Sequence, residues 1–166
     1  MISNMLAAEE FQVVSAIVPV DLQTGANNGD WVSMKNYDRC TVIFFKGIGT
    51  AGDDPVMTMA QATDVAGTGV KALTFTRIDV KVGTQTGIGT FTKVTQSAAS
   101  TYTDTVSAEA QGLFMIEIMA SDLDVANGFD CVRFNVPDVG GNAQIGCALY
   151  LLRNARFLAP LSAIID

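Results

Sequence analysis

A period of two residues dominates the hydrophobic pattern of this chain. Apolar and polar residues largely alternate in 73–82, and further runs of strand length are found at 13–20, 40–45, 55–63, 113–119, 131–136 and 145–152. Turns rich in glycine and asparagine separate these runs, and a helical pattern is confined to 5–11. Many short strands without interleaved helices form a sandwich or a barrel. We therefore expect an all-β fold of roughly eight to ten strands, an antiparallel two-sheet β-sandwich of the jelly-roll type.

The length of 166 residues fits one domain. The sequence contains no internal repeat, no linker and no low-complexity tract, so we expect a single sandwich over 1–166. It is flanked by a short N-terminal arm (1–12) and a C-terminal arm (153–166). Pro19 lacks an N–H group for a sheet ladder, so we expect it to end the first strand or to sit at the edge of that strand.

The composition excludes several classes of protein. Charged residues make up 16% of the chain and apolar residues 49%, against about 25% charged residues in an average domain. This excludes intrinsic disorder and suggests that other subunits cover part of the apolar surface. The ten lysines and arginines are scattered and the net charge is −7, which argues against a nucleic-acid partner. Neither a membrane span nor a cleaved signal peptide is expected, since no apolar run is long enough and Glu9 and Glu10 interrupt the first segment.

Histidine is absent, which removes every mechanism and metal site that needs imidazole. Carboxylates, lysine, tyrosine and cysteine can still act in catalysis, so an enzyme built on a carboxylate cluster is an open alternative. The linear sequence singles out no such cluster, and we expect no enzymatic activity, no catalytic residues, no metal and no cofactor. The three cysteines, Cys40, Cys131 and Cys147, lie in apolar runs with no close pair. We expect three unpaired, buried thiols, in keeping with synthesis in a reducing cytoplasm.

Three stretches that suggest ligands are better explained as turns. The stretch 47–52 is a literal GxGxxG, but Asp53, Asp54 and Pro55 follow where a dinucleotide fold needs a helix N-terminus. The glycine-rich stretch 83–89 has no lysine after it in the Walker manner. The loop 122–130 is rich in oxygen ligands, yet its glycine and its last residue do not fit an EF-hand. There we expect a turn at Asn127 and Gly128, with an ion site as the open alternative.

Three segments of the sequence resemble a known protein family. The runs 30–45, 61–73 and 121–133 are similar to small virion proteins of tailed bacteriophages, and most of all to jelly-roll capsid decoration (cement) proteins. The likeness extends over about 13–152 and carries no catalytic motif. The resemblance implies a dimer or trimer made in the host cytoplasm. On the outside of the virion it binds the phage major capsid protein and clamps neighbouring capsid subunits.

An alternative function is a β-sandwich module of a phage virion that binds a receptor or a carbohydrate. In that case Trp31 and Tyr37 would stack on a sugar, whereas in the simpler interpretation they are core residues, as are Phe44 and Phe45.

The C-terminal segment is the candidate contact with other subunits or with the capsid. Five large apolar residues lie within nine positions after the last expected strand, a composition not expected of a solvated tail. These residues are Phe157, Leu158, Leu161, Ile164 and Ile165. Either the chain's own sandwich or a neighbouring subunit buries them. Self-association is also expected because Val13, Val14, Ile17, Val18, Met115 and Met119 exceed the apolar needs of a small sandwich.

Overall fold

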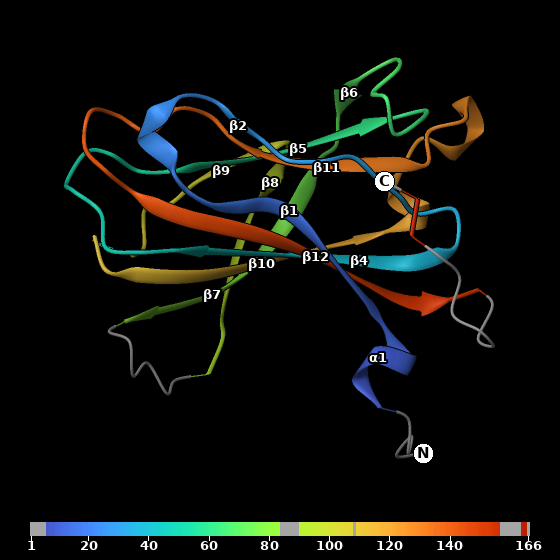
Figure 1. Ribbon diagram of the computed structural model, residues 1–166, viewed down its shortest axis with the longest axis horizontal. Coiled ribbons are helices and arrows are strands. Elements are labelled where there is room, and N and C mark those ends of the chain that lie inside the picture. The colour runs from blue at the N-terminus through green and yellow to red at the C-terminus, as the bar shows by residue number, and fades with distance from the viewer. Residues whose placement is uncertain (1–5, 84–89, 108, 157–163, 166) are drawn as a thin grey trace.

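Two antiparallel sheets pack face to face in the computed structural model, which describes residues 6–83, 90–107, 109–156 and 164–165 (Figure 1). In spatial order, sheet A contains β1 (Gln12–Asp21), β12 (Ile145–Ala155), β4 (Tyr37–Lys46), β10 (Gln111–Met119), β7 (Phe75–Gly83) and β8 (Thr92–Ala99). Sheet B contains β2 (Asn27–Asn28), β11 (Cys131–Val136), β5 (Val56–Ala62) and β6 (Lys71–Ala72), with β3 (Val32–Ser33) paired to β11 and β9 (Thr101–Thr103) paired to β5. Short helical turns complete the described elements: α1 (Ala7–Glu10), η1 (Leu22–Thr24), η2 (Ala120–Asp122) and η3 (Val125–Asn127).

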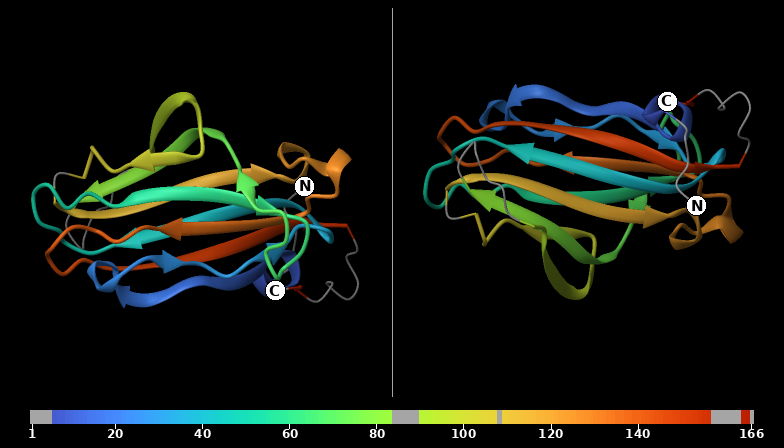
Figure 2. Two further views of the ribbon diagram at one scale, coloured as in Figure 1. Left: turned by 90° about the horizontal axis from the view of Figure 1, so that it is seen from above. Right: turned by 90° about the horizontal axis from the view of Figure 1, so that it is seen from below.

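The strand pairing is nested. Strand β1 pairs with β12, β2 and β3 with β11, β4 with β10, and β5 with β9, all antiparallel. Successive pairs fall alternately in sheet A and sheet B, as in one long antiparallel ribbon rolled into two layers, which is the jelly-roll arrangement. The β7–β8 hairpin is inserted between β6 and β9 and widens sheet A beyond β10 (Figure 2). The expected two-sheet jelly-roll sandwich is confirmed.

The hydrophobic core fills the space between the sheets because alternate residues of each strand point inward. On sheet A these are Cys40, Val42 and Phe44 of β4, Phe114, Ile116 and Ile118 of β10, and Ala148, Tyr150 and Leu152 of β12. The Phe44 ring lies 5.9 Å from that of Phe114 and 5.5 Å from that of Phe134 on β11, measured between centroids. Phe44 therefore contacts aromatic side chains of both sheets.

The two sheets are also joined by polar contacts at Tyr150. Its hydroxyl donates to the carbonyl oxygen of Asp30 (2.9 Å) and accepts from the backbone N–H of Phe134 (2.7 Å). Burial raises the pKa of this hydroxyl, so it stays protonated and able to donate. At Gly29, beside this contact, a Cβ atom would lie 2.3 Å from the Phe134 carbonyl oxygen, so only glycine fits at this position.

The segments expected to be strands are strands, and the short N-terminal helix is α1. Pro19 lies within β1, an edge strand of sheet A, where the register with β12 shifts between Ile17 and Val20. The sandwich extends into both expected arms, because β1 begins at Gln12 and β12 continues to Ala155. In the described part of the chain, no helix is long and apolar enough to cross a membrane.

Candidate assembly interface

The outer face of sheet A carries apolar side chains across its central strands. Residues directly opposite each other in an antiparallel sheet point to the same side, so the register defines rows across that face. One row contains Leu113, Phe45 and Cys147, the next contains Met115, Ile43 and Leu149, and Leu151 and Val13 pair in the third. We call these eight residues the sheet A patch.

Solvent reaches this patch. Val13 is 51% exposed, Phe45 46% and Leu149 39%, while the other members are half-buried. The outer face of an antiparallel sandwich is ordinarily polar, because only the inner face packs on the core. Contiguous apolar patches of this kind mark interaction surfaces, so the sheet A patch is the candidate interface of this protein.

Charged side chains border the patch. At one end, Glu117 of β10 pairs with Arg39 of β4 and with Arg153 of β12, and Arg153 also donates to the Thr41 hydroxyl at 3.1 Å. On β7, the Arg77 guanidinium bonds the Asp79 carboxylate at 2.7 Å, which raises the pKa of Arg77. An apolar centre within a polar rim is the usual anatomy of a protein–protein interface.

The rim is basic although the protein is acidic. Five of the ten lysines and arginines lie at outward positions of sheet A, namely Arg39, Arg77, Lys81, Lys93 and Arg153. The outward acidic groups on these strands are Asp79 and Glu117, with Asp21 at the far end of β1. Five cations against three anions give this face a local charge of +2, in a chain whose net charge is −7.

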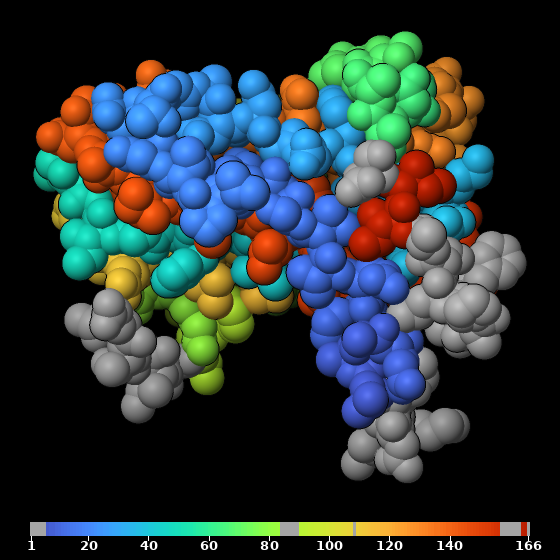
Figure 3. All heavy atoms as spheres, in the orientation of Figure 1, coloured from blue at the N-terminus to red at the C-terminus, as the bar shows by residue number. Residues whose placement is uncertain are grey.

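Two segments project on the same side as the patch. In Figure 1, α1 hangs below sheet A at one end, and one end of the β7–β8 hairpin reaches down at the other. The space-filling view shows a recess between these two projections (Figure 3). A molecule bound to the sheet A patch would therefore meet α1 as well.

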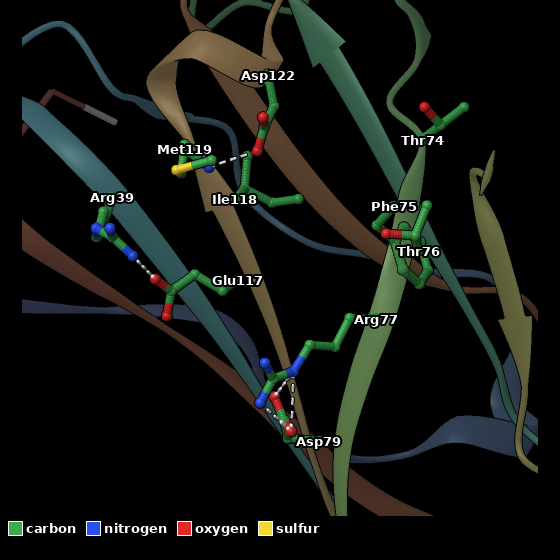
Figure 4. A pocket seen from close by; sticks show the side chains of 10 residues that line it. All are labelled: Arg39, Thr74, Phe75, Thr76, Arg77, Asp79, Glu117, Ile118, Met119 and Asp122. Carbon is green, nitrogen blue, oxygen red and sulfur yellow. Dashed lines mark hydrogen bonds and ion pairs between the residues drawn. The ribbon is translucent and has the colours of Figure 1, made fainter. Parts of the chain in front are cut away.

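A pocket of about 580 Å³ opens beside the patch, where β7 and β10 separate. The two strands pair from Gln111↔Gly83 to Met115↔Asp79, whereas β10 stays paired to β4 as far as Met119. Figure 4 shows the side chains that line the gap, which are Arg39, Thr74, Phe75, Thr76, Arg77, Asp79, Glu117, Ile118, Met119 and Asp122.

The carboxylates of this pocket are already engaged. Asp79 and Glu117 are held by arginines, and Asp122 accepts from the backbone N–H of Met119 at 2.8 Å. Each charged side chain of the pocket therefore already has a partner, and the pocket adds mainly Met119 and the threonines to the rim of the patch.

The C-terminal contact residues are only partly within the described structure. Phe157, Leu158 and Leu161 lie outside the described residues. Ile164 is half-buried and packs against the main core, and the carbonyl oxygen of Ile165 accepts from the Ser33 N–H at 2.9 Å. The end of the chain thus returns to its own sandwich beside β3, and a contact with other subunits stays a prediction.

Two of the three ligand-like stretches are loops in the structure, and residues 84–89 of the third lie outside the described residues. Residues 47–55 connect β4 to β5 without a helix, so no helix N-terminus faces the glycines. In 122–130 the turn is at Gly128, whose φ is 81°, and the Asn127 amide donates to Asp124 at 2.8 Å. Asp124 also pairs with Lys71, which lowers the pKa of its carboxyl group. The expected turn at Asn127 and Gly128 is confirmed.

The aromatic residues and cysteines divide between core and surface. Trp31, Tyr37 and Phe44 are buried, as expected of core residues, whereas Phe45 belongs to the sheet A patch. All three cysteines are unpaired. Burial raises the pKa of the Cys40 and Cys131 thiols to about 12, and Cys147 is half-buried on the outer face, also with a raised pKa.

The sequence indicates an excess of apolar residues, but only some of the residues named for self-association lie on the exposed face. Met115 and Val13 belong to the patch, yet Ile17 is buried and Val14 packs against the core. The missed signal is in the runs 40–45, 113–119 and 145–152, which are apolar at nearly every position instead of alternating. Continuous apolar runs are typical of strands covered on both faces.

The fold and the exposed patch define a jelly-roll β-sandwich with a candidate assembly face. No family model matches the chain, and no curated protein is similar to it in sequence. Among solved structures, the crystal structure of the SPBc2 prophage-derived protein YomS is similar, with a TM-score of 0.46 and 13% sequence identity. The alignment covers 86% of this chain and 93% of the other.

Proposed function

We propose that this protein is a phage virion structural protein that decorates the capsid exterior, where it acts as a homo-oligomer and clamps major capsid subunits. The observation that supports this most is the sheet A patch, an apolar surface with a charged rim on a jelly roll. The phage capsid as partner rests on the resemblance of 30–45, 61–73 and 121–133 to decoration proteins.

The physical logic is additive. Each copy gains little from a single capsid contact, but an oligomer that holds two capsid subunits at once gains from effective concentration. The acidic remainder of the surface then faces solvent and keeps particles apart by charge.

The sugar-binding alternative finds less support. Trp31 is 8% exposed and Tyr37 1%, and the guanidinium of Arg133 covers the Trp31 ring at 4.6 Å. Neither ring presents a free face on which a sugar could stack.

Binding to heads tests the proposal. Purified protein is mixed with empty, expanded heads assembled from the major capsid protein of the phage that encodes this chain, and bound copies are counted after sedimentation. We expect saturable binding and heads that withstand a higher temperature. The test uses about 50 µM protein, a concentration that favours even weak association. The proposal is contradicted if no protein sediments with the heads and the heads are as fragile as they are without it.

A further inference from the structure

The sheet A patch is too small to hold a partner by itself. It is four strands wide and five residues long, which corresponds to roughly 19 Å by 17 Å, or about 300 Å² in projection. A stable interface removes about 800 Å² from each partner. Further contact must therefore come from the rim and from segments that project beside the sheet.

The N-terminal arm, residues 6–11, is such a segment. None of the four residues of α1 is buried, and Leu6 is 70% exposed. A single helical turn without a buried face is not stable in water on its own. The arm leaves β1 on the side of the sheet A patch (Figure 1), so whatever binds the patch also reaches the arm.

The arm and the rim have opposite charges. Glu9 and Glu10 lie in α1, and the arm carries no basic residue. The rim of the patch has a local charge of +2, counted above from its five cations and three anions. Leu6 and Phe11 add apolar surface at the two ends of the acidic pair.

We propose that the sheet A patch binds a second copy of this chain in a two-fold dimer, in which the N-terminal arm of each copy lies against the basic rim of the other. Under two-fold symmetry, the acidic arm of each copy contacts the basic rim of the other, so the same contact forms twice. Both copies then use the same surface, and assembly stops at the dimer. This inference rests on the proposed function only in treating the patch as an assembly surface. It adds the partner and the segment that completes the contact.

Light scattering on the free protein tests the dimer. The parent at about 50 µM should have twice the mass of one chain, because dimers form by mass action. Leu149→Asp places a charge at the centre of the patch and should weaken association at least about thirtyfold. Its matched control is Val125→Asp, which puts the same charge at a 62% exposed valine of η3 and should leave the dimer intact.

A charge reversal tests the arm. Glu9→Lys with Glu10→Lys should weaken association at least about tenfold at low salt, because like charges then face each other. The control is Asp54→Lys with Asp138→Lys, which changes the net charge equally at two exposed loop positions. Circular dichroism of each variant confirms that it is folded.

The native Cys147 gives an independent readout. It lies within the patch and is half-buried, whereas Cys40 and Cys131 are buried. Alkylation of Cys147 should be slower in the parent dimer than in folded, monomeric Leu149→Asp.

A monomeric parent would overturn the inference. So would a Leu149→Asp dimer as tight as that of Val125→Asp, or arm variants that dimerise as tightly as their control. A dimer that fails to bind heads removes the proposed function and leaves this inference standing. A monomer that binds heads overturns this inference and leaves the capsid binding of the proposed function standing.

Discussion

The ammonium group of Lys46 lies 3.1 Å from the carboxylate of Asp104, and neither side chain is more than 2% exposed. Lys46 ends β4, and Asp104 follows β9 with its carboxylate also accepting the backbone N–H groups of Val106 and Ser107. The pair therefore fastens the β9–β10 connection to the end of a central strand of sheet A. Such a pair is costly to desolvate, but removing one partner leaves a charge uncompensated in the interior.

Lys46→Met should therefore lower the free energy of unfolding by about 3–5 kcal/mol, measured by urea denaturation. The control is Arg156→Met, which removes the exposed pair with Asp38 and should cost at most about 1 kcal/mol. Equal effects in the two variants would show that the buried pair has no special weight.

Tyr150→Phe should lower the free energy of unfolding by about 1–3 kcal/mol, because the buried Phe134 N–H loses its acceptor. Hydrogen exchange at the Phe134 amide should accelerate in the same variant. The Met59 amide, which donates to the Ser100 carbonyl, is the internal control and should change only with global stability. Unchanged exchange at Phe134 would mean that the hydroxyl does not hold that amide.

Gly29→Ala should destabilise the protein by more than about 2 kcal/mol, because the new Cβ would sit 2.3 Å from the backbone oxygen of Phe134. Backbone atoms cannot move aside as a flexible side chain can. Gly141→Ala is the matched control, since nothing lies within 4 Å of its Cβ position and the substitution restricts only the unfolded chain. Thermal melting of the two variants should separate them clearly.

Acid should loosen the β5–β6 region first. Hydrogen bonds from Thr68 lower the pKa of Asp64, and Lys71 lowers that of Asp124. A carboxyl group with a lowered folded pKa contributes stability above its unfolded pKa of about 3.9, and this contribution is lost as the pH falls through the folded pKa. The free energy of unfolding should therefore decrease below about pH 4. Asp64→Asn with Asp124→Asn should flatten that decrease, and an unchanged slope would contradict the assignment.

The class of fold could be predicted from the sequence because turns and strand lengths are local properties. The stretch 73–82 alternates, and Gly128 sits in a turn, and both features are visible without a structure. The pairing of β1 with β12 could not be predicted in the same way, because it joins residues such as Val13 and Leu151 that are far apart in the chain. The sheet A patch depends on that same register, so its members could be recognised as apolar but not as neighbours.

The buried ion pair of Lys46 and Asp104 could not be predicted from the sequence, for a different reason. Lysine and aspartate are nearly always at the surface, so Lys46 and Asp104 have no local mark of burial. Only their positions at the ends of β4 and β9 bring them together in the interior. Gly29 likewise differs from the turn glycines because a distant carbonyl oxygen, and not its own φ, excludes a side chain.

The nested pairing has a consequence for how the protein is made. Strand β12, the last of the described strands in chain order, lies between β1 and β4 in sheet A. Among the described strands of sheet A, β1 therefore has no neighbour until β12 has been made, while the pairing of β5 with β9 can form much earlier. Sheets with such distant contacts fold slowly and expose strand edges meanwhile. Completion of this jelly roll therefore waits for β12, and a premature stop before β12 leaves sheet A split and open to aggregation.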